Sequence, residues 1–222
     1  MADAAEATER GVHTLHVLYR SYNAVARSRG LGDVLHALID HLAAFAEPDR
    51  TDEVQVEAGV VVAEGGVVLI PLRVLRWEPM ELGTQLRRQG LALSSMAAVR
   101  LDLDTGRLVV PEPALTLDRA PLEELGAATG GPGWLPPGAH PVLGWVLPAP
   151  GAESLSRAAA VAIAARAVTN PATVGAGPML RGLAAVLSAV PAVPVAESWR
   201  AAEVSQAVAA VLAARAGATT GA

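Results

Sequence analysis

A hydrophobic strand that leads into a helix is the feature that most limits what this chain can fold into. In the segment GVVLIPLRVLRWEPMELGTQLRRQG (66–90), the apolar run 67–70 predicts a buried strand. The stretch 79–89 predicts a helix, because Pro79 suits its first turn and Gly90 suits its C-terminal end. A strand followed by a helix is a building unit of α/β proteins. The sequence therefore predicts an α/β or α+β fold in which helices flank a mixed central sheet.

The rest of the chain supplies further strands and helices. The segment VQVEAGVVVAEGGVVLIP (54–71) predicts two strands joined at a hairpin turn, Glu64-Gly65-Gly66. A tight turn at Asp104-Thr105-Gly106 separates two more strands, and residues 125–141, rich in Gly and Pro, predict a loop. The remaining strands are expected at 13–22, up to Asp102, at 107–110 and at 142–147, and helices at 30–45, 153–169, 176–190 and 198–215, the last capped by Glu197-Ser198.

Three parts are expected along the chain. Residues 1–50 form an N-terminal strand–helix segment, either a separate module or an edge of the sheet. Residues 51–196 form the core, and 197–222 a C-terminal helix with a tail, so that the last third of the chain is helical.

Composition excludes several classes of function. The chain has 222 residues and is 52% hydrophobic, which is enough for a sizeable core. It contains no cysteine, so disulfides, thiolate metal sites and a cysteine nucleophile are excluded. The net charge of −5 argues against a nucleic-acid partner. The acidic N-terminus is no signal peptide, and the apolar run 158–168 is too short to span a membrane, so a cytoplasmic protein without membrane contact is expected.

The connection between the strand at 67–70 and the helix at 79–89 is where many α/β proteins carry a phosphate-binding loop. Such a loop needs glycines, whose backbone N–H groups turn toward phosphate, and a lysine for the terminal phosphates. The connection PLRVLRWEPM (71–80) has no glycine, and all 17 basic residues of the chain are arginines. No Walker-type loop is therefore present, although Arg73 and Arg76 bring positive charge to this position.

No catalytic set and no metal site emerges from the remaining polar residues. Asp102 and Asp104 flank a predicted turn, so a turn is favoured over a magnesium site. Ser94 and Ser95 have no base nearby in the sequence. The five histidines share no ligand spacing: His13, His16, His36, His41 and His140. We expect no catalytic residues, no metal and no cofactor.

Two short stretches are candidates for binding a partner. The 71–80 connection carries Arg73, Arg76 and Trp77, which combine charge with a large aromatic surface. The Gly/Pro loop has Trp134 in it and Trp145 beside it, and these two side chains are expected either to line a groove for a peptide or to pack the loop onto the domain.

Roughly residues 50–195 resemble the HPr kinase/phosphorylase-related family. Members of that family have a strand, a phosphate loop and a helix before a segment R-x-G-[YH]-R-[YL]-L-S-D-D-x-V-x-[LI]-D. The similar run here is RRQGLALSSMAAVRLDLDTGRLVVPEPALTL (87–117). The closing family pattern, with an Asn-Pro element, a helix and a V-P-A-x-x-[LV] strand, resembles AVTNPATVGAGPMLRGLAAVLSAVPAVPV (167–195). The resemblance implies a kinase-like core at 51–196.

The chain departs from the family pattern where the family does its chemistry. The family's Gly-Lys-Ser/Thr would fall near 77–80, where it is absent. The acidic pair that the family uses around magnesium and the phosphorylated hydroxyl falls at Met96 and Ala97, after a retained Ser95. Phosphoryl transfer depends on positioning and charge neutralisation, so losing both removes activity. The departures predict a kinase-like protein without catalytic activity.

Three hypotheses follow for the function. The first is a catalytically inactive binding, scaffold or regulatory component that holds a protein or peptide; by the resemblance, it belongs beside the enzymes of a peptide-modification gene cluster. The second is a divergent ATP-dependent serine kinase that grips nucleotide through Arg73 and Arg76, with Asp102 or Asp104 on magnesium. The third is a structural subunit that forms an oligomer through its Ala/Val-rich C-terminal helices, around 199–215.

Overall fold

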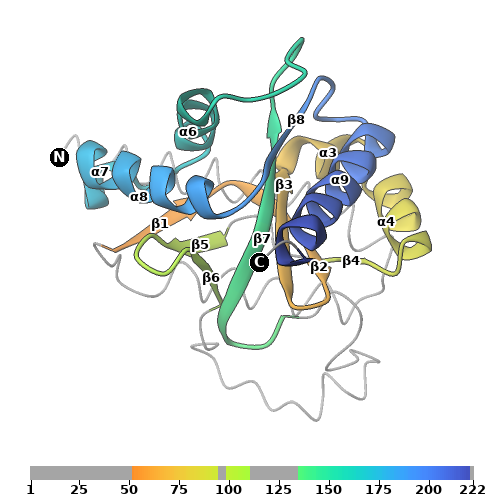
Figure 1. Ribbon diagram of the computed structural model, residues 1–222, viewed down its shortest axis with the longest axis horizontal. Helices are drawn as coiled ribbons and strands as arrows, with labels where there is room; N and C mark the ends of the chain where they lie inside the picture. Colours follow the sequence, from red (N-terminus) through yellow and green to blue (C-terminus); the bar gives the residue numbers. More distant parts are fainter. Residues whose placement is uncertain (1–51, 95–98, 111–134, 221–222) are drawn as a thin grey trace, which may run out of the picture.

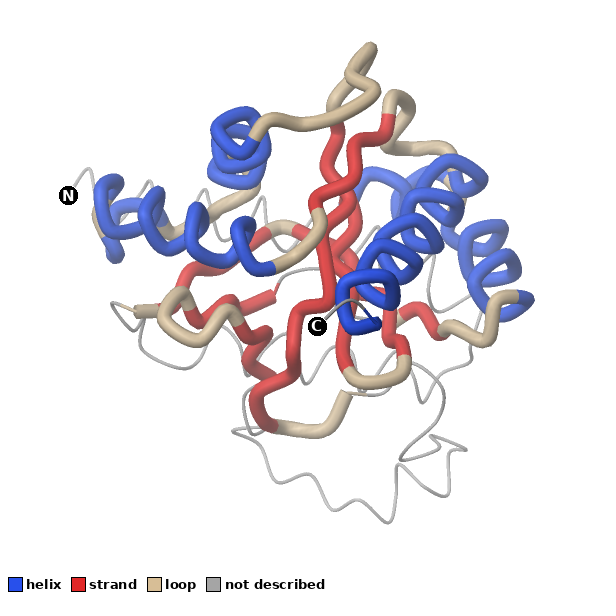
Figure 2. Tube along the Cα trace, in the orientation of Figure 1, coloured by secondary structure: helices blue, strands red, loops and turns tan. Residues whose placement is uncertain are grey.

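The central feature of the fold is one mixed sheet with helices on both faces. The computed structural model describes residues 52–94, 99–110 and 135–220, and these form an eight-stranded sheet. Figure 1 and Figure 2 show one group of helices on each side of it. The prediction of a mixed α/β sheet flanked by helices is confirmed. The elements expected within 1–50, as well as Ser95, Met96, Ala97 and Trp134, lie outside the described residues.

The strands follow one another in the sheet in the order β1-β5-β6-β7-β3-β2-β4, and β8 pairs with β7. Most neighbours are antiparallel, but β3, β7 and β8 run parallel to one another. The strands are β1 (Glu53–Val56), β2 (Ala58–Ala63), β3 (Gly66–Pro71), β4 (Ala92–Leu93), β5 (Val99–Asp102), β6 (Arg107–Val110), β7 (Gly138–Pro148) and β8 (Ala192–Val195). The carboxyl ends of the three parallel strands therefore meet at one edge of the sheet.

The helices form two layers. The helices α3, α4 and α9 cover one face, and α6 and α8 cover the other, as their buried residues show. Their bounds are α3 (Leu72–Trp77), α4 (Pro79–Arg88), α6 (Arg157–Ala165), α7 (Pro171–Val174), α8 (Ala176–Ala189) and α9 (Ala201–Thr220). The crossover from β3 to β4 thus runs over one face, and the crossover from β7 to β8 runs over the other.

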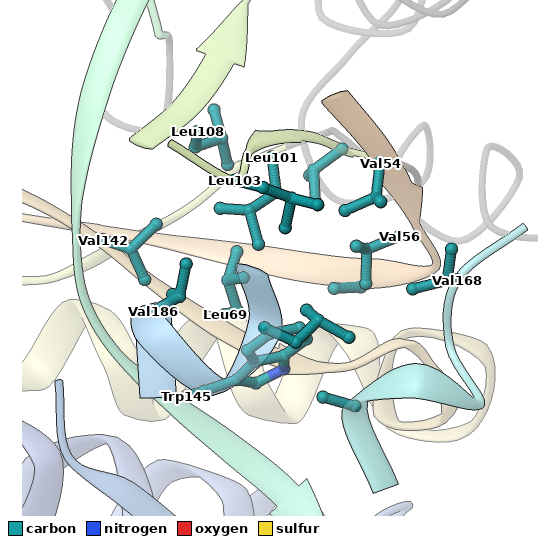
Figure 3. Packing of buried hydrophobic residues seen from close by; sticks show 14 of the residues in the cluster. Val54, Val56, Leu69, Leu101, Leu103, Leu108, Val142, Trp145, Val168 and Val186 are labelled. Carbon is teal, nitrogen blue, oxygen red and sulfur yellow. The ribbon is translucent and has the colours of Figure 1, made fainter. Parts of the chain in front are cut away.

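Two hydrophobic cores result from strands that are buried on both faces. In β3, Val67 and Leu69 point into the core under α6 and α8, whereas Val68 and Ile70 point into the core under α3, α4 and α9. This alternation is the two-residue period of a strand. Figure 3 shows Leu69 and Trp145 in the first of these cores. Full burial of each such aliphatic side chain contributes about 1.5–3 kcal/mol, so the sheet is the main source of stability.

Several sequence predictions are confirmed closely. Helix α4 begins at Pro79 and stops before Gly90, whose φ of 74° ends it as a left-handed residue. The β2–β3 hairpin turns at Gly65, with φ 79°. The strand that ends at Asp102, the turn before Arg107 and α8 also lie where they were predicted.

Other predicted boundaries of strands and helices are wrong, because contacts with neighbouring elements outweigh the local sequence preference. The expected strand 54–63 breaks at Glu57 into β1 and β2, which pair with different neighbours. The strand expected at 142–147 already begins at Gly138, inside the predicted loop, because 138–141 pairs with β6. The connection after β3, for which no helix was predicted, contains the helix α3.

The cap of the last helix is also corrected. Glu197-Ser198 was expected to cap it, but α9 begins at Ala201, whose backbone N–H donates to Oε2 of Glu78 at 2.8 Å. Glu78 lies at the junction of α3 and α4, 123 residues earlier in the chain. The start of α9 is therefore fixed by a tertiary contact that its own sequence does not contain.

The Ala/Val-rich face of the last helix packs inside the molecule. Ala201, Val204 and Val208 are completely buried in the core shared with α3 and α4. The face that motivated the oligomer hypothesis is therefore covered by the chain itself. None of the helices within the described residues is long and apolar enough to cross a membrane.

Candidate functional site

The segment after β3 lacks the geometry of a phosphate loop. Strand β3 ends at Pro71 and α3 begins at Leu72 without an intervening loop. Pro71 has no N–H group, and the segment 71–78 contains no glycine. The glycine-rich ring of backbone N–H groups that surrounds phosphate in a Walker loop is therefore absent here.

A cleft of about 580 Å³ opens at this position instead. Its volume is in the range that holds a small molecule or a short stretch of peptide. The walls come from α3, from the ends of β3 and β7, from the C-terminal end of α6, from Glu57 and from Ser198 after β8. The lining residues are Glu57, Ile70, Pro71, Leu72, Arg73, Arg76, Trp77, Trp145, Val146, Leu147, Pro148, Ile163, Arg166, Ala167 and Ser198. Four of the five residues predicted to bind a partner thus lie in one cleft.

The position of the cleft in the fold is the usual one for a ligand site. It lies at the carboxyl ends of the parallel strands β3 and β7. The chain leaves β3 toward one face of the sheet and leaves β7 toward the other, and the cleft lies where the two connections part. Open α/β sheets bind their ligands at such a switch point.

The charge of the cleft is positive. Its lining includes Arg73, Arg76 and Arg166, called here the cleft arginines, and Glu57 is the one carboxylate among the lining residues. All three arginines are exposed, and within the described part of the chain none of their guanidinium groups makes an ion pair or a hydrogen bond.

A neighbouring arginine shows what an engaged guanidinium looks like in this region. Arg200 contacts Oε1 of Glu78 at 3.7 Å, Oε2 of Glu197 at 3.2 Å and the ring of Trp199 at 4.4 Å. The charge of Arg200 is therefore neutralised within the chain. The charges of the cleft arginines remain available to a bound anion.

The two tryptophans of the cleft differ in their roles. Trp77 is 67% exposed at the end of α3, where it presents a large aromatic surface to solvent. Trp145 is only 2% exposed and packs in the core with Leu69, so it is chiefly a packing residue at the floor of the cleft. Trp145 thus belongs both to the core and to the lining of the cleft, whereas its expected packing against the Gly/Pro loop concerns residues that lie largely outside the described ranges.

Helix α3 explains why Arg73, Arg76 and Trp77 lie together on one side of the cleft. Positions three and four apart lie on the same face of a helix, so Arg76 and Trp77 both share a face with Arg73. The opposite face of α3, with Leu72, Val74 and Leu75, is buried against the sheet.

Two charged residues of the cleft, Glu57 and Arg166, were missed by reasoning from the sequence. Glu57 enters at the break between β1 and β2, and its backbone N–H donates to the carbonyl oxygen of Ala167 at 2.8 Å. This bond holds Glu57 beside the end of α6, where Arg166 lies. Residues 57 and 166 come close only in the tertiary structure, so no local sequence pattern could predict that either of them lines the cleft.

The acidic residues considered for magnesium lie elsewhere. Oδ1 of Asp102 accepts the backbone N–H groups of Asp104 at 2.9 Å and Thr105 at 3.0 Å, which closes the predicted turn. Asp102 is paired with Glu53 at the start of β1. Neither aspartate lines the cleft, so the cleft arginines and this acidic pair do not form one site.

The other polar candidates do not join the cleft either. His140 lies in β7, and its Nε2 is 2.8 Å from the carbonyl oxygen of Pro136. Ser94 is buried beside β2, with its backbone N–H bonded to Val60. Among the described residues, no group of three or more His, Asp or Glu side chains is arranged to hold a metal ion.

Comparison of the chain with family models, with curated proteins and with solved structures finds no match. The arrangement of the cleft itself therefore carries the functional interpretation.

Proposed function

We propose that this protein is a catalytically inactive binding or scaffold component that holds a protein or peptide partner in the cleft at the carboxyl ends of β3 and β7. The observation that carries the proposal is the set of cleft arginines, which line a ligand-sized cavity and have no partner in the described part of the chain. Arginine and tryptophan are the residues that most often dominate the energy of protein interfaces.

The absence of a phosphate loop speaks for binding without catalysis. A kinase must hold the terminal phosphates and place a metal ion against them. The segment 71–78 has neither the glycines nor the lysine for the first task, and Asp102 and Asp104 lie outside the cleft. The resemblance to kinase-like proteins, together with these departures, supports a pseudoenzyme in a peptide-modification gene cluster.

A divergent phosphotransferase remains the second candidate. The position of Arg73 and Arg76 at the carboxyl ends of parallel strands favours it, because nucleotides bind there in many α/β proteins. In that case nucleotide is held by arginines alone, without the backbone N–H groups of a glycine loop.

The experiment that separates the two candidates combines nucleotide titration with a peptide selection. Calorimetry of the full chain with ATP and ADP, with and without magnesium, is expected to give no heat of binding. Selection from a displayed library of random peptides is expected to enrich sequences that the full chain retains.

A matched pair of variants assigns that binding to the cleft. A protein with Arg73, Arg76 and Arg166 all changed to Ala should lose the selected peptides. An Arg181→Ala protein should keep them, because Arg181 is an exposed arginine on α8 that does not line the cleft. Magnesium-dependent binding of ATP with phosphate transfer, or no cleft-dependent peptide in the selection, would overturn the proposal.

A further inference from the structure

We infer that the partner segment held in the cleft is an acidic peptide in which carboxylates lie next to a bulky apolar residue. This inference rests on the proposed function and adds the chemistry of the partner. It draws on three features of the cleft, which are its charge, its exposed aromatic side chain and the absence of a glycine-rich phosphate loop.

Charge is the first feature. The lining carries three guanidinium groups against one carboxylate, so the empty cleft holds an excess of positive charge. A guanidinium offers a planar pair of N–H donors that matches the two oxygens of a carboxylate. Because the cleft arginines come from α3 on one side and the end of α6 on the other, a bound segment with more than one carboxylate can contact both walls.

An exposed aromatic side chain is the second feature. Trp77 lines the cleft and is 67% exposed. It is the most exposed of the large hydrophobic residues in the described ranges. Aromatic residues, methionine and arginine are enriched together at protein interfaces. An apolar side chain beside the carboxylates of the ligand can cover Trp77 while the charges enter the cleft.

The kind of anion is the third feature. Phosphate sites at the ends of strands in α/β proteins are built mainly from backbone N–H groups that surround the oxygens. Here Pro71 has no N–H group, and the chain enters α3 directly. The cleft therefore offers exposed guanidinium groups rather than a glycine-rich ring of backbone N–H groups, which suits the carboxylates of a flexible peptide better than a buried phosphate.

Glu57 adds a preference for how the segment lies. It shares one wall with Arg166, whereas Arg73 and Arg76 form the other wall. A carboxylate of the ligand is repelled near Glu57 and attracted near α3. The most acidic part of the segment is therefore expected beside Arg73 and Arg76.

Three short synthetic peptides test the inference by fluorescence anisotropy with the full chain. The first contains glutamates and aspartates around one leucine and one phenylalanine. The second has glutamine and asparagine at every acidic position, and the third has glycine at both apolar positions. The first is expected to bind at least about tenfold more tightly than either of the others.

Protein variants assign that binding to the cleft. Arg73→Ala, Arg76→Ala and Arg166→Ala should each weaken the first peptide several-fold, whereas Arg181→Ala should not. Arg76→Lys should restore part of the affinity, because it retains the charge but loses the paired donors. Trp77→Ala should weaken the first peptide but leave the third unchanged. Added salt should weaken the first peptide and not the second.

The possible failures are distinguishable. Equal binding of the acidic and amide peptides through the cleft would overturn the inference while leaving the proposed function intact. Stronger competition by inorganic phosphate than by the acidic peptide would also overturn it, in favour of a phosphate site. Binding of ATP with transfer of its phosphate would overturn both. Failure of all three peptides, while library peptides of other composition bind, would remove the inference alone.

Discussion

The cleft and the turn between β5 and β6 differ in whether their charged side chains have hydrogen-bond partners within the chain. In the turn, the carboxylate of Asp102 accepts two backbone N–H groups, so its hydrogen-bonding capacity is used within the chain. In the cleft, three arginines face one carboxylate and, among the residues that the structure describes, have no partner. A charged group that is hydrogen-bonded within the chain contributes to the stability of the fold. A charged group without a partner at a ligand-sized cavity indicates a binding site.

The contrast predicts that changes to the turn alter stability and that changes to the cleft arginines alter binding. Four substitutions test this separation. They are ordered by their expected effect on the free energy of unfolding.

Trp145→Ala should have the largest effect, because Trp145 is almost fully buried although it lines the cleft. Removing a buried aromatic side chain lowers the free energy of unfolding by about 3–5 kcal/mol. Urea denaturation measures the change. Trp77→Ala serves as the control, since an exposed side chain should change stability by no more than about 0.5 kcal/mol. If the two variants are equally stable, Trp145 is not the packing residue described here.

Asp102→Ala should lower the free energy of unfolding by about 1–2 kcal/mol, because two backbone N–H groups lose a charged acceptor. Asp102→Asn keeps an acceptor oxygen and should recover part of the loss. Chemical denaturation gives the stability, and anisotropy with the acidic peptide should give an unchanged affinity. A loss of peptide affinity in Asp102→Ala would show that the turn contributes to binding, and would contradict the separation of the turn from the cleft.

Glu78→Ala should cost about 1 kcal/mol, because α9 loses the acceptor for the N–H of Ala201. Glu78→Gln keeps an oxygen for that bond but loses the ion pair with Arg200, which lies partly exposed and contributes little. Thermal unfolding of both variants should therefore place Glu78→Gln close to the unchanged protein. Equal destabilisation of the two would show that charge, and not the cap, matters here.

The double change Arg73→Ala and Arg76→Ala should have the smallest effect on stability, within about 0.5 kcal/mol for each exposed site. Repulsion between neighbouring arginines on α3 is even relieved. The same protein should lose most of its affinity for the acidic peptide. A clear loss of stability, measured by urea denaturation, would mean that these arginines serve the fold.

Much of the sheet could be predicted from periodicity. Val67 to Ile70, the hairpin at Gly65 and the turn after Asp102 all carry signals within a few residues, and the structure has them at those positions. The boundaries of β1, β2 and β7 could not be predicted in the same way. The strand breaks at Glu57 where its backbone N–H bonds to Ala167 at the end of α6, and β7 begins at Gly138 because that residue pairs with β6.

The candidate site, too, could be predicted only in part from the sequence. Arg73, Arg76 and Trp77 stood out because they replace a phosphate loop after a strand. The helix that gathers them on one face was not expected, since six residues between a proline and a glutamate carry little helical signal. Trp134 lies outside the described residues, and its role stays a prediction.

By itself, the sequence determined that this chain builds an α/β sheet and that no lysine-based phosphate loop exists in it, because strand periodicity and residue type are local properties. Only the tertiary structure decided that Arg166 and Glu57 stand beside Arg73 and Arg76, and that Glu78 caps a helix 123 residues away. These neighbours are selected by parallel strand pairing and by packing on two faces of the sheet. Such contacts join residues far apart in the chain and leave no mark on the sequence around any one of them.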